Sequence, residues 1–518
     1  MPSSASQEQT ASVSGLAEKQ ARVRPRAECI LAAGRKPLRY EELLAQMRAT
    51  DDALRSFGIR KGDRVAIVLP NGPELAVAFL AVAASATSAP LNPAYRAEEF
   101  DFYLSDLNAK ALILLKGAET PAADVARQRG IAVVELEPLT EEPAGVFRLL
   151  PPVPPAPERA PQAGWASGDD VALVLHTSGT TSRPKIVPLT QANICASAAH
   201  IRAALTLSPE DRCLNVMPLF HIHGLIGGVL STITAGGSIV ATPGFDAMKF
   251  FGWLDEFRPS WYTAVPTMHQ VILARAARNQ EIVASTKLRF IRSSSAALPP
   301  RVMAELERIF HAPVIESYGM TEASHQMASN PLPPRSRKPG SVGVAAGPEI
   351  AVLDQAGNPV DAGQRGEVGI RGPNVTSGYE NNPEANATAF SNGWFRTGDQ
   401  GYLDEEGYLY ITGRLKEIIN RGGEKISPRE VDEVLLAHPS VDQAVTFALP
   451  HPRLGEEVAA AIVLREGQAA EEKQLREFAL QKLADFKVPS RFVFVDEIPK
   501  GPTGKLQRIG LAKQLGLS

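Results

Sequence analysis

The chain carries Val171-Ala172-Leu173-Val174-Leu175, followed directly by His176-Thr177-Ser178-Gly179-Thr180-Thr181-Ser182-Arg183-Pro184-Lys185. The first five residues are a short apolar run that predicts a buried strand. The residues after it combine hydroxyl side chains, one glycine and two cations. Such a loop can direct backbone N–H groups and hydroxyls toward one centre, which makes an anion site. The spacing differs from that of the GxxxxGK[ST] P-loop, and a plain surface loop rich in Ser and Thr remains the alternative.

Length and composition limit the class of protein. At 518 residues the chain is too long for one ordinary core, so at least two domains are expected. A net charge of −3 gives no bulk attraction for nucleic acid or an anionic membrane, and we expect neither as a partner. The cysteines at 29, 195 and 213 match no metal-binding spacing and are interpreted as reduced thiols.

The N-terminal region predicts no targeting segment. Residues 1–25 are expected to form a disordered tail, because Met1 to Gln20 is rich in Ser, Gln and Ala and lacks the apolar core of a signal peptide. The most apolar helix candidate, Glu74 to Ala84, is too short to span a bilayer and follows the helix-entry signal Asn71-Gly72-Pro73. We interpret it as a core helix and expect a cytoplasmic protein.

The pattern of elements predicts an α/β fold. From Tyr40 to Leu115 apolar strands alternate with helices, which favours a mostly parallel sheet. The proline-rich stretch from Pro151 to Pro161 is interpreted as a spacer. Short alternating segments from Ile350 to Ile370 predict a small β-subdomain. We therefore expect a large N-terminal domain over 26–412, a boundary at 413–417, and a small α+β domain over 418–518.

Four further motifs carry chemical groups. Each also has a purely structural interpretation, as core, turn or solvated surface. Their residues are Ser317-Tyr318-Gly319-Met320-Thr321-Glu322, Trp394-Phe395-Arg396-Thr397-Gly398-Asp399, Gly413-Arg414-Leu415-Lys416 and Pro502-Thr503-Gly504-Lys505. Among them a ring could stack on a base, a carboxylate could hold Mg²⁺ or a ribose, and a lysine could neutralise developing charge.

The order of these motifs resembles that of the acyl-adenylate-forming superfamily, which includes acyl-CoA synthetases, luciferases and the adenylation domains of peptide synthetases. The resemblance covers about Tyr40 to Leu511. It implies an adenylation domain with a mobile C-terminal lid, and a two-step ligase that uses ATP, Mg²⁺ and coenzyme A. A carboxylate first forms an acyl-adenylate and diphosphate, and the thiol of CoA then displaces AMP.

The same resemblance implies roles for individual residues. Four are expected to be catalytic: Lys505, Thr181, Glu322 and His221. Glu322 would hold Mg²⁺, and Lys505 would bridge the acyl carboxylate and the α-phosphate. The residues expected to bind the nucleotide and CoA are Thr177, Ser178, Gly179, Thr180, Thr181 and Lys185 for the phosphates; Ser295, Ala296, Ala297, Tyr318, Gly319 and Thr321 around the adenine and phosphates; Asp399 and Arg414 for the ribose; Lys416 at the hinge; and Gly422, Gly423 and Lys425 beside the CoA arm.

Two positions depart from the usual superfamily pattern. Ser182 and Ile186 stand where glycine is common. If position 186 needs a positive φ, isoleucine there costs about 1–3 kcal/mol; if it is extended, isoleucine only stiffens the following strand.

The expected acyl pocket is polar. It contains His221, His223, Arg292, Ser293, Ser294 and His325. His221 and His223 would share a face if their segment is extended, and a second carboxylate on the acid would match such a lining. A metal site built on His-X-His with His325, or a structural role for each histidine, are the alternatives.

The amino-acid sequence in three segments is most similar to that of oxalate–CoA ligases. These segments are Thr180–Lys185, Leu219–Leu225 and His325–Pro333. This similarity implies oxalate as the acid and oxalyl-CoA as the product. A ligase for a medium-chain fatty acid or an aromatic acid, and a non-catalytic or carrier-loading adenylate-binding protein, remain the competing interpretations.

Overall fold

The computed structural model describes residues 12–152, 164–177, 184–499 and 508–517. The chain divides into two compact units. The first comprises residues 1–339, 343–349 and 371–389, and the second comprises 340–342, 350–370 and 390–518. The predicted boundary at 413–417 falls inside the second unit, so a hinge there stays a prediction.

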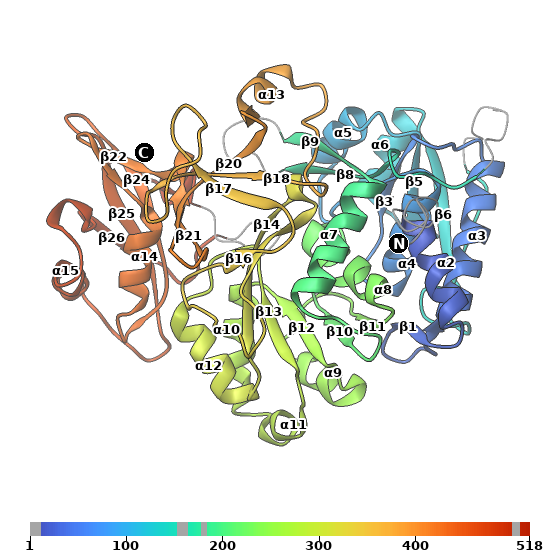
Figure 1. The fold of residues 1–518 in the computed structure, drawn as a ribbon, viewed down its shortest axis with the longest axis horizontal. Coiled ribbons are helices and arrows are strands. Elements are labelled where there is room, and N and C mark those ends of the chain that lie inside the picture. Colours follow the sequence, from blue (N-terminus) through green and yellow to red (C-terminus); the bar gives the residue numbers. More distant parts are fainter. Residues whose placement is uncertain (1–11, 153–163, 178–183, 500–507, 518) are drawn as a thin grey trace. The chain divides into compact units, whose positions relative to one another are not determined.

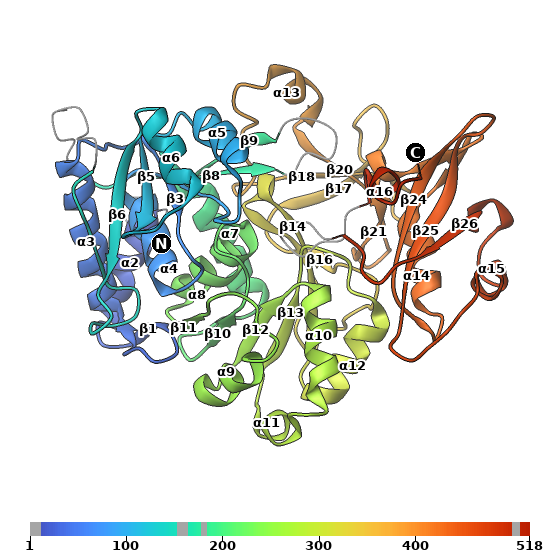
Figure 2. The same cartoon turned by 180° about the vertical axis from the view of Figure 1, so that it is seen from behind.

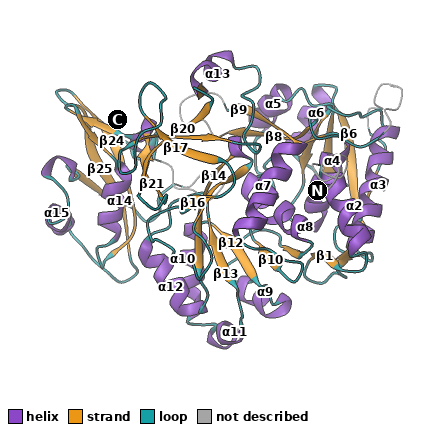
Figure 3. Ribbon diagram, in the orientation of Figure 1, coloured by secondary structure: helices purple, strands orange, loops and turns teal. Residues whose placement is uncertain are grey.

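The first unit contains two large sheets within its described residues (Figures 1 and 3). The nine-stranded sheet has the order β16 (Val344–Ala345), β15 (His325–Ser329), β14 (Val314–Met320), β13 (Phe290–Ser293), β12 (Trp261–Ala264), β10 (Arg212–Asn215), β11 (Ser238–Ala241), β1 (Glu28–Leu31) and β2 (Leu38–Arg39). The seven-stranded sheet has the order β7 (Phe147–Leu149), β6 (Ala132–Pro138), β5 (Ala111–Leu115), β3 (Arg64–Val68), β4 (Thr87–Pro90), β8 (Val171–Thr177) and β9 (Lys185–Thr190). Most neighbouring strands are parallel, which confirms the predicted α/β fold.

Both sheets are buried on both faces, which explains why their strands are almost continuously apolar. Successive side chains of a strand point to opposite faces. Thus Val65 of β3 and Trp261 of β12 belong to one hydrophobic cluster shared by the two sheets, whereas Ala66 and Tyr262 belong to two other clusters.

Helices cover these faces (Figure 2). They are α2 (Val13–Val23), α3 (Tyr40–Ser56), α4 (Pro73–Ser85), α5 (Ala97–Asp106), α6 (Pro121–Gln128), α7 (Gln191–Ala204), the π-helix η1 (His223–Leu230), α8 (Ser231–Ala235), α9 (Phe250–Phe257), α10 (Pro266–Ala276), α11 (Gln280–Ser285), α12 (Pro300–Phe310), the short 3₁₀-helix η2 (Thr321–Ala323) and α13 (Pro383–Ala389).

Helix α2 corrects the prediction of a disordered tail over residues 1–25. Ser12 caps the helix by accepting a hydrogen bond from the backbone N–H of Gly15. Val13, Leu16 and Ala17 follow helical spacing and are buried in the shared cluster. The polar composition of the segment concealed this apolar stripe. Residues 1–11 lie outside the described part of the chain.

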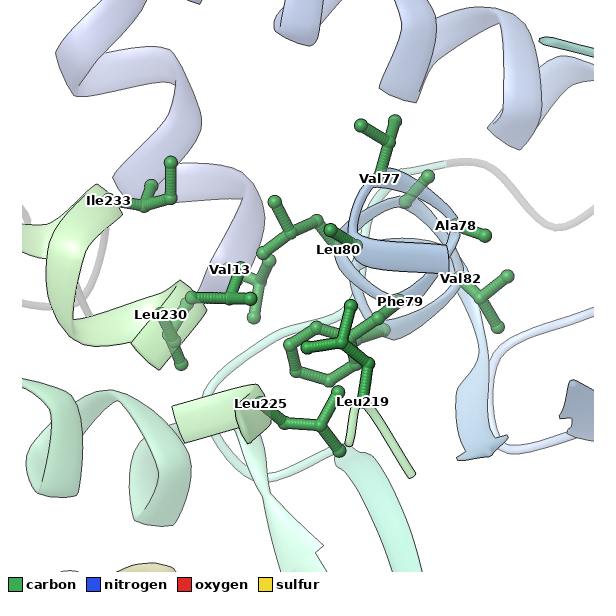
Figure 4. Close-up of a cluster of buried hydrophobic side chains, with 14 of the residues drawn as sticks. Val13, Val77, Ala78, Phe79, Leu80, Val82, Leu219, Leu225, Leu230 and Ile233 are labelled. Atoms are coloured by element: carbon green, nitrogen blue, oxygen red, sulfur yellow. The ribbon is translucent and has the colours of Figure 1, made fainter. Parts of the chain in front are cut away.

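Helix α4 lies at the centre of the shared cluster, as the prediction of a core helix requires. Every residue from Leu75 to Ser85 is buried, so the helix is apolar all round. Figure 4 shows Phe79 and Leu80 of α4 with Val13 of α2 and Leu225 of η1. Within the described residues, no helix is both long and apolar enough to cross a membrane.

The second unit contains two smaller sheets within its described residues. One comprises β17 (Glu349–Leu353), β18 (Gly366–Arg371), β20 (Trp394–Leu403), β19 (Phe390–Ser391) and β21 (Leu409–Arg414), which confirms the predicted small β-subdomain. The other comprises β23 (Glu424–Ile426), β22 (Ile419–Arg421), β25 (Gly455–Leu464), β24 (Val441–His451) and β26 (Arg491–Phe494). Its helices are η3 (Leu415–Glu417), α14 (Pro428–Leu436), α15 (Glu472–Leu480), η4 (Asp485–Lys487) and α16 (Leu511–Gln514), so this part is α+β as expected.

Candidate active site

Several predicted site residues lie where parallel strands of the nine-stranded sheet end. Strands β12, β13 and β14 are neighbours, and their parallel pairing ends close to Ala264, Ser293 and Glu316. Ligands of open α/β sheets bind outside the carboxyl ends of such strands. The topology therefore gathers the loops that follow these strands at one edge of the sheet.

Arg292 is the central cation of this edge. Its side chain is 1% exposed, and Nη2 donates hydrogen bonds to Nε2 of His325 at 2.9 Å and to Oε1 of Gln326 at 3.1 Å. Its Nε and Nη1 groups have no hydrogen-bond partner among the described residues. Burial lowers the pKa of Arg292 to about 10, so the guanidinium is still charged at neutral pH. A buried cation with unpaired N–H groups is suited to an anionic ligand.

His223 connects this cation to the neighbouring strand ends. Its Nδ1 lies 3.0 Å from Oγ of Ser295, and its Nε2 lies 2.6 Å from Oγ1 of Thr263. Its ring stacks on that of His325 with the centroids 5.0 Å apart. The structure thus brings three of the predicted substrate residues, His223, Arg292 and His325, into one cluster.

The segment around His223 is helical, so His221 and His223 do not share a face of an extended strand. The two histidines were predicted to share a face only if their segment were an extended strand, and the segment is not extended. The glycines that follow let this helix pack closely: a Cβ at Gly224 would lie 2.4 Å from the carbonyl oxygen of Pro218, and one at Gly228 would lie 2.9 Å from the side chain of Asn215. Only a glycine-rich helix can pack this closely.

Backbone strain marks the same edge. Ser295, Ser324 and His325 have positive φ values of 72°, 49° and 96°, which non-glycine residues rarely adopt. Gly319 is required by close packing, since a Cβ there would lie 1.7 Å from the carbonyl oxygen of His325. Such strain is concentrated at functional sites in proteins.

The remaining predicted residues of this edge differ in accessibility. Ala296 and Ala297 are exposed, and Tyr318 and Thr321 are half-buried. Ser294 is buried, and its hydroxyl donates to the carbonyl of Ser317, so it holds two strand ends together. The buried Oγ of Ser293 has no hydrogen-bond partner among the described residues.

The structure describes the two ends of the loop that is predicted to bind phosphate. Thr177 at the end of β8 pairs with Lys185 at the start of β9. Ile186 is buried and extended within β9, so the strain considered for this position does not arise. Ser178, Gly179, Thr180, Thr181, Ser182 and Arg183 lie outside the described residues.

Glu322 is held by Tyr379, which lies outside the predicted motifs. Its side chain is buried, and Oε1 accepts a hydrogen bond from the hydroxyl of Tyr379 at 2.8 Å. No group of three metal-ligating side chains occurs among the described residues, so a His-X-His metal site has no support. A single carboxylate suits Mg²⁺, which is usually held by one or two carboxylates together with substrate phosphates. Glu322 fits that role.

His221 is the remaining histidine of the predicted acyl pocket. It lines a cavity of about 40 Å³, together with His176, Tyr103, Tyr95 and Thr321. Because one water needs about 10–15 Å³, the cavity has room for a few waters at most. His176 precedes the predicted phosphate-binding loop, and its Nε2 lies 2.9 Å from Oδ2 of Asp106.

Comparison with known proteins assigns the family. Residues 17–380 match the AMP-binding enzyme family, and residues 430–505 match its C-terminal domain. The chain belongs to the AMP-binding enzyme family. The oxalate–CoA ligase of Arabidopsis thaliana is 46% identical over 504 residues, covering 96% of this chain and 97% of that protein. The oxalate–CoA ligase of Saccharomyces cerevisiae is 45% identical over 480 residues, covering 88% of this chain and 87% of that protein.

A solved structure supports the same assignment. ATP-bound MatB from Rhodopseudomonas palustris superposes with a TM-score of 0.84 at 30% identity, covering 95% of this chain and 97% of that one. The family resemblance predicted from the ordered motifs is therefore confirmed, as is the fold of an AMP-binding enzyme.

The second unit carries the other predicted residues of this AMP-binding enzyme. Buried Asp399 and exposed Arg414 face each other across β20 and β21, with Oδ1 and Nε 3.0 Å apart. Lys416 is exposed in η3. Gly422 and Gly423 form a turn with positive φ, followed by exposed Lys425. The expected roles of these residues in binding ribose and CoA stay predictions, and Lys505 lies outside the described residues.

Several residues of this edge were not among the predicted site residues. Oε1 of Gln326 accepts a hydrogen bond from Nη2 of Arg292. Gly227 leaves space for the guanidinium, because a Cβ at position 227 would lie 2.9 Å from Nη1 of Arg292 and from Nε2 of His325. Tyr379 contacts Glu322 across 57 positions of sequence. No local pattern signals a contact over that separation.

Proposed function

We propose that this protein is an ATP-dependent, cytoplasmic oxalate–CoA ligase that forms oxalyl-CoA, AMP and diphosphate. Its similarity to oxalate–CoA ligases over most of the chain supports this proposal. Its membership of the AMP-binding family accounts for the use of ATP and CoA.

The reaction takes place in two balanced steps. One carboxylate oxygen of oxalate attacks the α-phosphorus of ATP, and diphosphate leaves. The thiol of CoA then attacks the carbonyl carbon, AMP leaves, and the thiol proton is released. Bound Mg²⁺ would neutralise charge on the phosphates. Of the chain's residues, Thr177, Lys185 and Glu322 hold the triphosphate and its metal, and Lys505 neutralises the approaching anions.

The buried guanidinium of Arg292 is the main support for oxalate as the acid. Both carboxylates of oxalate are charged at neutral pH, so the one that does not react must be paired within the protein. The guanidinium of Arg292 provides a buried charge with unpaired N–H donors, and His325 and His223 lie beside it. A planar guanidinium matches a carboxylate in geometry as well as in charge.

Medium-chain and aromatic acids fit this edge poorly. Their pockets are lined mainly by apolar groups, whereas the cluster here consists of a guanidinium, two imidazoles and an amide. This polar lining favours an acid with a second charged group.

The test is CoA- and ATP-dependent release of AMP by the full-length protein with a panel of acids. The panel contains oxalate, oxamate, acetate, malonate, octanoate and a cinnamate. Oxamate is the matched control, because an amide replaces one carboxylate at nearly constant size. We expect turnover with oxalate and at least tenfold lower kcat/KM with oxamate, about 1.4 kcal/mol. Equal use of oxamate, or a preference for octanoate or the cinnamate, would overturn the proposal.

A further inference from the structure

The segment from 373 to 380 connects the two sides of the expected phosphate site. The backbone N–H of Thr376 donates to the carbonyl of Glu322 at 2.7 Å, and its hydroxyl donates to the carbonyl of Pro188 at 2.9 Å. The backbone N–H of Glu380 donates to the carbonyl of Ile186 at 3.1 Å. The segment therefore ties the strand that follows the phosphate-binding loop to the residue expected to hold the metal.

Tyr379 lies in this segment and contacts two charged groups. Its hydroxyl donates to Oε1 of Glu322, and Nζ of Lys185 lies 4.3 Å from the centroid of its ring. Its backbone is fixed at both ends by Asn386, whose Oδ1 accepts from the N–H at 2.8 Å and whose Nδ2 donates to the carbonyl at 2.7 Å. One side chain, on a backbone held by two hydrogen bonds, thus contacts both the carboxylate and the cation.

Each contact has a defined physical effect. A hydrogen bond to a ligating carboxylate fixes its orientation, and loss of such an outer partner typically weakens metal binding about 10- to 100-fold. The face of an aromatic ring attracts an ammonium group and limits where it can lie. Burial, followed by the charge of Glu322, raises the pKa of Tyr379, so the phenol keeps the proton that it donates.

We propose that Tyr379 is a positioning residue that sets the carboxylate of Glu322 and the ammonium group of Lys185 at a fixed separation, so that the metal and the triphosphate bind together. The proposal rests on the roles given above to Glu322 and Lys185. It predicts that the hydroxyl of Tyr379 governs the metal requirement, and that its ring governs the affinity for ATP.

The experiment is a Mg²⁺ titration of acid-dependent exchange between ATP and diphosphate, using the full chain at saturating acid. If the panel identifies an acid other than oxalate, that acid is used. Tyr379→Phe keeps the ring and loses the hydroxyl, and Tyr379→Leu loses both. Tyr40→Phe is the matched control, because its buried hydroxyl donates to the carbonyl of Gly237. Glu322→Gln tests the metal ligand itself.

For Tyr379→Phe we expect the Mg²⁺ concentration for half-maximal rate to rise about tenfold, with the KM for the acid and the thermal midpoint unchanged. For Tyr379→Leu we expect the KM for ATP at saturating Mg²⁺ to rise as well. The Mg²⁺ dependence of Tyr40→Phe should equal that of the wild type.

Three results would overturn the proposal. A wild-type Mg²⁺ requirement in Tyr379→Phe, with a large change in Glu322→Gln, would leave the role of Glu322 intact and remove that of Tyr379. An unchanged requirement in Glu322→Gln would refute the metal assignment on which the proposal rests. A lower thermal midpoint with equal rises in all KM values would make Tyr379 a structural residue only.

Discussion

Nη2 of Arg292 lies 2.9 Å from Nε2 of His325, and the other two nitrogens of the same guanidinium, Nε and Nη1, have no hydrogen-bond partner among the described residues. A buried charge left partly unpaired destabilises the free protein. Its presence at the carboxyl end of β13 is explained if a ligand completes its hydrogen bonds.

Replacing Arg292 by methionine should therefore affect substrate binding far more than folding. We expect Arg292→Met to raise the KM for oxalate about 10- to 100-fold, since a hydrogen bond to a charged group contributes about 1.5–3 kcal/mol. The thermal midpoint should stay within a few degrees, because apolar residues often replace buried charges without loss of stability. Steady-state kinetics and calorimetry measure the two effects.

The matched control for this variant is Arg289→Met, just before the same strand. Arg289 is paired with Asp211, with Nε and Oδ1 2.9 Å apart. Its loss should lower the thermal midpoint and leave the KM for oxalate unchanged. A wild-type KM in Arg292→Met would show that the cation does not bind the acid.

A methyl group at position 227 should disturb the same cluster. In Gly227→Ala the new Cβ would lie 2.9 Å from both Arg292 and His325, so one of them must move. Overpacking of this kind costs about 1–3 kcal/mol, and we expect the KM for oxalate to rise about tenfold. Gly252→Ala is the control, because nothing lies within 4 Å of its Cβ position. Equal kinetics in the two variants would contradict the proposed position of the pocket.

The pH dependence of the KM for oxalate distinguishes the two kinds of cation in the cluster. Burial lowers the pKa of Arg292 to about 10, so its charge persists below that pH and is lost above it. We expect a constant KM from about pH 7 to 9, with a rise as the pH approaches 10. A protonated imidazole as the source of charge would instead raise the KM as the pH passes about 6.5, the ordinary imidazole pKa.

Lys505 should act in the first half-reaction only. We expect Lys505→Ala to abolish acid-dependent exchange between ATP and diphosphate, because the charge that builds between the two anions is no longer neutralised. Transfer to CoA from a prepared acyl-adenylate should survive. Lys513→Ala, an exposed lysine of α16, is the control. Loss of both half-reactions to the same extent would contradict this role.

Local patterns in the sequence predicted most of the fold. The apolar runs at Arg64–Val68 and Val171–Thr177 are strands, and Pro73–Ser85 is a core helix, because strand and helix periodicity are local properties. Helix α2 was missed because its buried positions are few and lie among polar residues. For the same reason, composition alone was a poor guide at the N-terminus.

The site was predicted in part. Arg292, His223 and His325 could be grouped from the resemblance, and the structure brings them together. The contact between Tyr379 and Glu322, and the space left by Gly227, depend on segments far apart in the sequence. Side-chain contacts of this kind are fixed by tertiary packing, which no local periodicity encodes.

The most direct measurement is a competition among acids. The full-length protein is incubated with ATP, Mg²⁺, CoA and an equimolar mixture of oxalate, malonate, octanoate and a cinnamate, and the thioesters formed are quantified by mass spectrometry. Their ratio reports the relative kcat/KM values directly. We predict oxalyl-CoA as the main product, formed in equal amount with AMP. A mixture dominated by octanoyl-CoA or the cinnamoyl thioester would contradict the assignment.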